Sequence, residues 1–244
     1  MQIYQAIILG FIQGFTEFLP VSSSGHLAIA SNFLSIENGL FFDTVLHLAT
    51  LLPLIIVFRK EIMTVLKSPN KILLLIIATI PAGIVGIFFS PFVEKVLSNN
   101  LSLSICFFIG ATVMLISSFI KKGNKKHGIK SALILGLFEA LAVFPGISRS
   151  GTVISGGNFL KIDEEENRAF TFILSIPIII SSVFFSAIKS TTTPPLAPTV
   201  LGFLSALVSG FISVLIMKKI SLKSGLKGFS IYLYFLSATL FIFG

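Results

Sequence analysis

Long apolar runs separated by short polar segments make up almost the whole chain. Six of these runs cover residues 43 to 58, 71 to 90, 101 to 120, 168 to 188, 197 to 217 and 229 to 243. Because a helix rises about 1.5 Å per residue, a run of about 20 residues crosses the hydrocarbon core of a bilayer, which is about 30 Å thick. The pattern therefore predicts an all-α integral membrane protein with several transmembrane helices.

Two further segments, residues 6–36 and 132–162, have similar sequences. Aligned at an offset of 126 positions, they are identical at 12 of 31 positions, and the shared residues include glycine, serine and asparagine. Hydrophobic composition alone rarely places such residues at a fixed register, so the similarity predicts an internal duplication. We assign residues 1–122 to the first repeat and residues 123–244 to the second.

Each repeated segment contains a polar turn that interrupts its helix, at residues 20–25 and 145–151. Proline removes an amide donor, and glycine and serine relax the helix, so we expect two short helices meeting at each turn. This predicts a re-entrant hairpin over residues 1–36 and another over residues 130–162. A hairpin plus three spans gives an odd number of crossings, so the repeats should be inverted, with a shared site near the membrane midplane.

Composition and charge support a membrane protein and add an orientation. Hydrophobic residues make up 54% of the chain and charged residues 11%, and the mean hydropathy is +0.99. The net charge of +8 does not require a nucleic-acid partner, and we expect none, because the basic residues sort by membrane side. Two of them, Lys95 and Lys189, fall on one side, which makes the other side cytoplasmic and predicts a multi-pass protein of the bacterial inner membrane with both termini extracytoplasmic. The fifteen on the cytoplasmic side are Arg59, Lys60, Lys67, Lys71, Lys121, Lys122, Lys125, Lys126, Lys130, Lys161, Arg168, Lys218, Lys219, Lys223 and Lys227.

Five polar residues lie in the hairpins at a depth where charge is costly. Gln13 and Glu17 are four residues apart on one helical face, Glu139 occupies the repeat position of Gln13, and the turns carry His26 and Arg149. A charged side chain in hydrocarbon costs about 2.5 to 3.5 kcal/mol on insertion scales, so the cluster requires an explanation.

Two interpretations of this cluster are open. The simpler one is an intramembrane ion pair between Glu17 and Arg149 that holds the hairpins together. The other is a phosphate site, because guanidinium groups, the amides of Gly-Ser turns and hydroxyls all bind phosphate oxygens. A carboxylate and an imidazole beside them can hold a divalent cation, relay a proton or attack phosphorus. The phosphate site also explains the hydroxyls and glycines at the same depth.

Four other residues outside the hairpins have side chains of interest. Asp43 and His47 lie one turn apart, either beside the site or as an interfacial pair at the end of a span. His127 follows several lysines and is expected to be a solvated loop residue. The single cysteine, Cys106, excludes an internal disulfide.

Two motifs in the hairpins resemble those of a known family, the undecaprenyl pyrophosphate phosphatases associated with bacitracin resistance in bacteria. The first is Glu or Gln, three residues, then Glu, here Gln13 to Glu17 followed by FLPVSSSGH; the second is PGxSRSG, here PGISRSG at residues 145–151. The resemblance covers essentially the whole chain. It implies hydrolysis of undecaprenyl diphosphate to undecaprenyl phosphate and inorganic phosphate, for recycling of the lipid carrier in peptidoglycan synthesis, usually with Mg²⁺ or Ca²⁺.

The family motifs also imply roles for individual residues. They imply catalytic roles for Glu17, Ser23, His26 and Arg149, with Ser23 and His26 both candidates for the nucleophile. They imply a divalent cation at Glu17 and Gln13, although glutamine at position 13 leaves one fewer carboxylate for the metal. The residues expected to contact substrate are Gln13, Ser22, Ser24, Gly146, Ser148, Ser150 and Thr152.

The main alternative function is a flippase or transporter of the polyprenyl phosphate carrier, because inverted repeats with broken helices are also a transporter architecture. A histidine beside a serine and a carboxylate is unnecessary for carriage and favours hydrolysis. The expected partners are the polyprenyl diphosphate substrate and the lipid bilayer, and the sequence leaves a monomer and a homodimer open.

Overall fold

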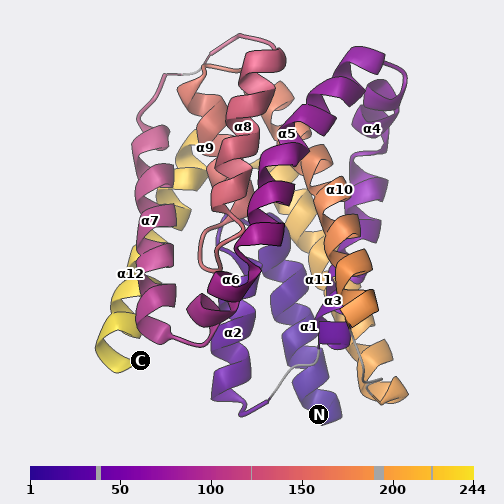
Figure 1. Cartoon of the computed structure of the whole chain (residues 1–244), viewed down its shortest axis with the longest axis vertical. Coiled ribbons are helices and arrows are strands. Elements are labelled where there is room, and N and C mark those ends of the chain that lie inside the picture. Colours follow the sequence, from indigo (N-terminus) through magenta and orange to yellow (C-terminus); the bar gives the residue numbers. More distant parts are fainter. Residues whose placement is uncertain (37–39, 122, 190–194, 221) are drawn as a thin grey trace.

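The computed structural model describes residues 1–36, 40–121, 123–189, 195–220 and 222–244. Within these residues the chain forms twelve α-helices and no strand (Figure 1), which confirms the predicted all-α class. The helices are α1 (Ile3–Phe18), α2 (Ser23–Phe33), α3 (Leu40–Val57), α4 (Arg59–Leu66), α5 (Pro69–Phe88), α6 (Ser90–Leu97), α7 (Asn100–Ser118), α8 (Ile129–Leu141), α9 (Arg149–Phe159), α10 (Glu164–Lys189), α11 (Leu196–Lys219) and α12 (Leu222–Phe243).

The six predicted spans correspond to six long helices. Five of them, α5, α7, α10, α11 and α12, are long and apolar enough to cross a membrane by themselves. The sixth, α3, passes the same test only together with α4, and the two helices are bent by 82° relative to each other. The bend follows from the sequence, because Arg59, Lys60 and Glu61 end the apolar run and are costly to place in hydrocarbon.

Two short hairpins, α1–α2 and α8–α9, lie where the repeated segments predict them. They enter the bundle from opposite ends, and their turns meet inside it (Figure 1). The first turn places Ser22 at a φ of 70°, in the left-handed region that is unfavourable for a residue with a side chain. In the second turn, the residue with positive φ is Gly146, at 93°, where the missing Cβ removes that penalty.

Each hairpin packs closely against a span from the other half of the chain. On α1, Gly10 lies against the backbone of Gly202 in α11. On α8, Gly136 lies in the same way against the backbone of Ala78 in α5. In both places a Cβ on the first glycine would collide with the neighbour's carbonyl oxygen, so these contacts require glycine.

The spans α7 and α12 form a further contact between the two halves. Ser104 Oγ donates to the Ser237 carbonyl and Ser237 Oγ donates to the Ser104 carbonyl, each at 2.8 Å. Such reciprocal contacts are compatible with inverted repeats. The division into repeats 1–122 and 123–244 stays a prediction.

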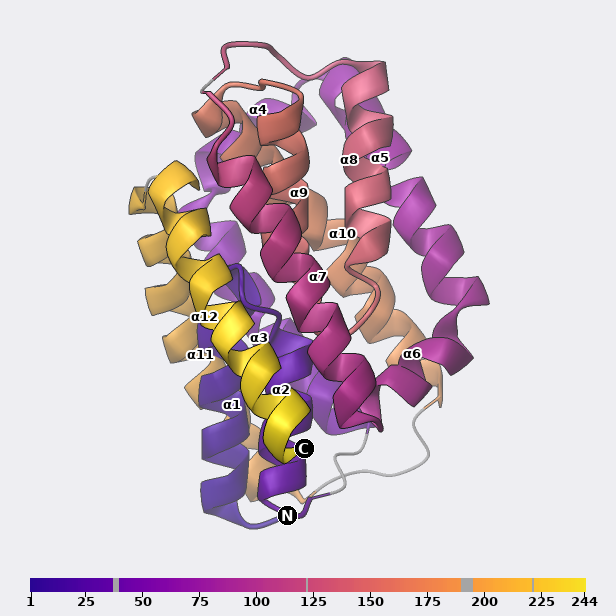
Figure 2. The ribbon, with the colours of Figure 1, turned by 90° about the vertical axis from the view of Figure 1, so that its left-hand side faces the viewer.

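The bundle has one end that carries both termini and an opposite end that carries α4 (Figure 2). The C-terminal end of α11 lies at the α4 end, since Lys218 Nζ is 3.1 Å from Glu61 Oε1 of α4. The connection between α7 and α8, which is rich in lysine, lies at the same end (Figure 1). Lys218 and the connection rich in lysine therefore lie at the same end of the bundle as α4, although Lys122 lies outside the described residues.

His127 lies in a loop, as expected, but the expectation that its side chain is solvated is wrong. Its ring stacks on Phe170 of α10 with the centroids 4.2 Å apart, and its backbone N–H donates to Glu166 Oε1 at 3.2 Å. Burial lowers the pKa of the His127 imidazole, and the nearby Glu166 partly offsets this. The neighbouring lysines in the sequence therefore did not predict the direction in which the His127 side chain points.

Candidate active site at the hairpin turns

Glu17 lies at the centre of a buried polar cluster in the first hairpin. It is in the last turn of α1, and its side chain is 1% exposed. Gln13, one helical turn earlier, donates from Nε2 to Glu17 Oε2 at 2.8 Å. Ser23, brought back by the turn to the start of α2, donates from Oγ to the same oxygen at 2.7 Å. The contact between the Glu17 carboxylate and the Ser23 hydroxyl is therefore the one expected between a general base and its nucleophile.

Arg149 reaches the same carboxylate from the second hairpin. It is the first residue of α9; its Nη2 forms an ion pair with Glu17 Oε1, and its Nη1 donates to the Ser175 carbonyl of α10 at 3.4 Å. The ion pair of the simpler interpretation is thus present. It does not account for the whole cluster, because the other oxygen of Glu17 accepts from Gln13 and Ser23. The Arg149 side chain is 21% exposed, so the guanidinium is the more accessible member of the pair.

The two turns also bond directly to each other. Ser22 Oγ in the first turn accepts from the Gly146 N–H of the second at 3.0 Å. In return, Ser150 Oγ donates to the Leu19 carbonyl of the first turn at 3.3 Å. Because α2 and α9 both begin at this junction, their N-terminal amides converge on it, and helix N-termini attract anions.

The remaining residues expected to contact substrate are at the junction but differ in what their hydroxyls do. Ser24 Oγ lies 3.4 Å from Ser22 Oγ and is partly exposed. Ser148 is the N-cap of α9 and accepts from the Gly151 N–H at 3.2 Å. The Thr152 hydroxyl is buried and donates back to the Ser148 carbonyl at 2.9 Å, so it serves its own helix.

His26, the second candidate nucleophile, has partners at both ring nitrogens. Its Nδ1 is 2.8 Å from the Ser22 carbonyl oxygen, and its Nε2 is 2.6 Å from the Tyr232 hydroxyl of α12. Both nitrogens are thus engaged away from the Ser23–Glu17 pair. The geometry favours Ser23 as the nucleophile, a choice that the sequence left open.

His47 lies beside the cluster, which supports the first of the two interpretations of Asp43 and His47. Its Nε2 is 3.8 Å from Glu17 Oε2, and its Nδ1 is 2.8 Å from the Asp43 backbone carbonyl oxygen. The imidazole therefore belongs to the surroundings of Glu17.

Comparison with known proteins assigns the family. The sequence model of the family described as bacitracin resistance protein BacA matches residues 6–239. The chain belongs to the BacA family. It is 37% identical over 254 residues to the undecaprenyl-diphosphatase of Carboxydothermus hydrogenoformans, covering 99% of this chain and 97% of that one. It is 37% identical over 240 residues to undecaprenyl-diphosphatase 4 of Bacillus thuringiensis subsp. konkukian, covering 94% and 93%. It is 35% identical over 270 residues to the undecaprenyl-diphosphatase of Methanobrevibacter smithii, covering 99% and 98%.

The residues of this BacA-family chain fit a divalent cation only as part of a larger ligand set. Across the part of the chain that the structure describes, no three His, Cys, Asp or Glu side chains gather as a metal cluster. Gln13 Oε1 is nevertheless buried without a hydrogen-bond partner, next to the Glu17 carboxylate. The Gln13 amide oxygen and a Glu17 carboxylate oxygen would be two ligands for Mg²⁺, which binds one or two carboxylates and completes its shell with water and substrate phosphates. Both Glu17 oxygens already accept hydrogen bonds, from Arg149 on one side and from Gln13 and Ser23 on the other.

Sequence reasoning missed some residues of this BacA-family site. Tyr232 lies on an apolar span far from both hairpins in sequence, and Ser175 contributes only its backbone carbonyl, so neither carried a signal. Glu139 was noticed but given no role; it is 2% exposed, and neither of its carboxylate oxygens has a hydrogen-bond partner.

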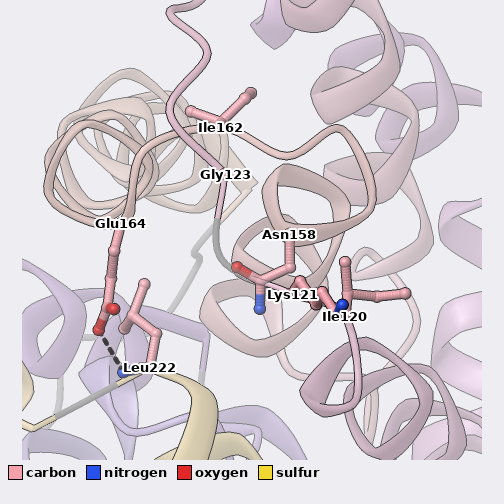
Figure 3. Close-up of a pocket in the computed structure, with 7 residues that line it drawn as sticks. All are labelled: Ile120, Lys121, Gly123, Asn158, Ile162, Glu164 and Leu222. Carbon is pink, nitrogen blue, oxygen red and sulfur yellow. Dashed lines mark hydrogen bonds between the residues drawn. The ribbon is translucent and has the colours of Figure 1, made fainter.

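A small hollow at the α4 end is a separate feature (Figure 3). Its volume is about 20 Å³, enough for about one water molecule and too small for a diphosphate. Its carboxylate, Glu164, already accepts from the Leu222 N–H at 2.8 Å. The hairpin turns are therefore the better candidate for the BacA-family active site. The residues that line the hollow are Ile120, Lys121, Gly123, Asn158, Ile162, Glu164 and Leu222.

Proposed function

We propose that this chain is an undecaprenyl-diphosphatase, which hydrolyses undecaprenyl diphosphate to undecaprenyl phosphate and inorganic phosphate. The observation that carries the proposal is the carboxylate of Glu17, which holds the Ser23 hydroxyl on one oxygen and Arg149 on the other. This arrangement supports Ser23 as the nucleophile, Glu17 as its base and Arg149 as a phosphate-binding fork. The names of the relatives agree with hydrolysis and give no support to the flippase alternative.

The reaction follows from this geometry in two steps. In the first, Ser23 Oγ bonds to the terminal phosphorus while its proton passes to Glu17 Oε2. The bond from that phosphorus to the bridging oxygen breaks, and its electrons leave with undecaprenyl phosphate. In the second step, the oxygen of a water molecule bonds to phosphorus and displaces Ser23 Oγ, which takes back its proton from Glu17. One water proton stays on the inorganic phosphate and the other is released to solvent.

Arg149 and the turn amides supply charge stabilisation. The guanidinium carries donors beyond those bonded to Glu17 and Ser175, and a planar fork of N–H groups matches two phosphoryl oxygens. The converging N-termini of α2 and α9 add partial positive charge. A cation held by Glu17 and Gln13 would neutralise further charge on the diphosphate.

The proposal includes a location and an orientation. A diphosphatase of this lipid carrier acts in the bacterial inner membrane, where it returns the carrier to peptidoglycan synthesis and so counters bacitracin. The basic residues at the α4 end support a cytoplasmic position for that end and extracytoplasmic termini. Both hairpins belong to the same chain, so one copy contains every residue of the cluster described above.

Purified protein in detergent tests the function directly. We expect release of inorganic phosphate from undecaprenyl diphosphate, reduced by a chelator and restored by Mg²⁺ or Ca²⁺. The Ser23→Ala variant is the matched inactive control. Absence of phosphate release, together with movement of the intact carrier across vesicle membranes, would overturn the proposal in favour of a flippase.

A further inference from the structure

His26 is held by an aromatic residue from the far end of the chain. The Tyr232 hydroxyl lies 2.6 Å from His26 Nε2, and the two rings stack with centroids 5.7 Å apart and planes 16° apart. Phe107 of α7 and the imidazole pack edge to face, with centroids 5.8 Å apart and planes 84° apart. The ring therefore has defined neighbours from α7 and α12 and a defined orientation.

The hydrogen bonds determine which nitrogen carries the proton in the neutral ring. The Ser22 carbonyl oxygen can only accept, so His26 Nδ1 must be the N–H donor of that 2.8 Å contact. Nε2 then presents a lone pair, and the Tyr232 O–H donates to it. Tyr232 thus selects the tautomer that binds the Ser22 carbonyl.

The Ser22 carbonyl is part of the turn that sets the nucleophile. Ser22 has a φ of 70°, a conformation that surrounding contacts must maintain. The next residue, Ser23, must remain 2.7 Å from Glu17 Oε2 for the proposed first step. The Ser22 carbonyl accepts from the His26 backbone N–H at 3.2 Å as well as from the His26 ring at 2.8 Å. The shorter bond, from the ring, adds a restraint on this carbonyl and so on the position of the Ser23 hydroxyl.

We propose that Tyr232 is a positioning residue of the active site: it holds His26 as the Nδ1–H tautomer, which fixes the Ser22 carbonyl and so aligns Ser23 with Glu17. This inference rests on the proposed function for its effect on turnover. The tautomer of His26 and its dependence on the Tyr232 hydroxyl can be tested without measuring hydrolysis.

The test compares Tyr232→Phe with Tyr234→Phe. Tyr234 lies on the same helix and donates to Thr112 Oγ1 of α7 at 2.8 Å, so Tyr234→Phe also removes one interhelical hydrogen bond but leaves His26 untouched. For hydrolysis of undecaprenyl diphosphate, we expect Tyr232→Phe to lower kcat about tenfold, the scale of one lost neutral hydrogen bond, with KM within about twofold of wild type. For Tyr234→Phe, both kcat and KM should stay within about twofold of the wild-type values. In a His26→Ala background, adding Tyr232→Phe should have no further effect.

A second measurement does not depend on activity. In ¹⁵N-histidine-labelled protein, His26, assigned by its loss in His26→Ala, should show a protonated Nδ1 and an unprotonated, hydrogen-bonded Nε2. Tyr232→Phe should shift the Nε2 signal, and Tyr234→Phe should not. A protonated Nε2 in the neutral ring, or equal effects of the two Phe variants on kcat, would overturn the inference. If the wild type hydrolyses nothing, the proposed function fails while the NMR signals still decide the tautomer.

Discussion

Glu17 of α1 and Arg149 of α9 form an ion pair across the junction of the two hairpins, although 132 positions separate them in the sequence. The pair joins the side chain that holds the Ser23 hydroxyl to the side chain best suited to bind phosphate. A bound diphosphate would share the guanidinium with Glu17, so binding and activation of the nucleophile depend on the same contact.

We predict that Arg149→Lys loses most of the hydrolytic activity, by at least about a hundredfold, because an ammonium is a point charge that cannot bind Glu17 and two phosphoryl oxygens in one plane. The measurement is phosphate release from undecaprenyl diphosphate by the purified variant. Arg168→Lys, whose guanidinium pairs with Glu164 near the α4 end, is the control and should keep its activity. Near-normal turnover in a folded Arg149→Lys protein would contradict a role for Arg149 in binding phosphate and would mean that its ion pair with Glu17 is only structural.

Ser23→Ala should reduce hydrolysis at least about a hundredfold, since the variant lacks the oxygen that we propose attacks phosphorus. Rapid acid quenching of the wild type with labelled substrate should trap acid-stable phosphate on serine. Ser98→Ala, a change in an exposed connection near the start of α7, should behave like wild type. Acid-labile phosphate on histidine would show instead that His26 is the nucleophile.

Gln13→Glu should lower the Mg²⁺ concentration needed for half-maximal activity, because it places a second carboxylate next to Glu17. Calorimetric titration of the metal into the substrate-free protein should show the same direction. The matched variant Gln5→Glu adds the same charge at a partly exposed position near the start of α1 and should leave the metal requirement unchanged. An unaltered requirement in Gln13→Glu would remove position 13 from the proposed metal ligands.

The orientation can be tested with single cysteines, one at each end of the bundle, introduced into the Cys106→Ala variant. The two cysteines should differ in whether a thiol reagent reaches them from outside the cell. A membrane-impermeant thiol reagent added to intact cells should label Ser98→Cys, near the terminal end, and not Lys60→Cys on α4. Permeabilised cells should label both. The reverse pattern would contradict the proposed orientation and with it extracytoplasmic termini.

The thermal midpoint in detergent should fall as pH is lowered from about 7.5 to about 5.5, partly through His127. Its pKa in the folded protein is lowered from the ordinary value of 6.5, chiefly by burial. Below that value the unfolded chain takes up a proton that the folded protein binds less readily, so stability decreases as pH falls and is retained above it. His127→Gln should show a smaller fall, while Lys126→Gln should match the wild type. Equal falls in all three would exclude this contribution.

The sequence predicted the parts of the site that depend on local pattern. Proline, glycine and serine in two matched segments indicated both hairpins, and Gln13, Glu17 and Arg149 were found because polar groups are rare in apolar helices. Contacts between distant spans could not be predicted in this way. Tyr232 looks like any aromatic residue of a span until α12 is placed beside α2, and His127 was misjudged because its contact, Phe170, lies in another helix.

The close approach of Gly10 to Gly202 has a consequence for how the protein is made. The α1–α2 hairpin leaves the ribosome well before α11, the span that contains the Gly202 backbone against which Gly10 packs. Its polar turn also lacks Gly146 and Arg149 until the second hairpin is inserted. A polar turn is unfavourable in lipid when it has no protein neighbours. We therefore expect the first hairpin to reach its final depth late, and the polar cluster around Glu17 to be complete only after the second hairpin is in the membrane.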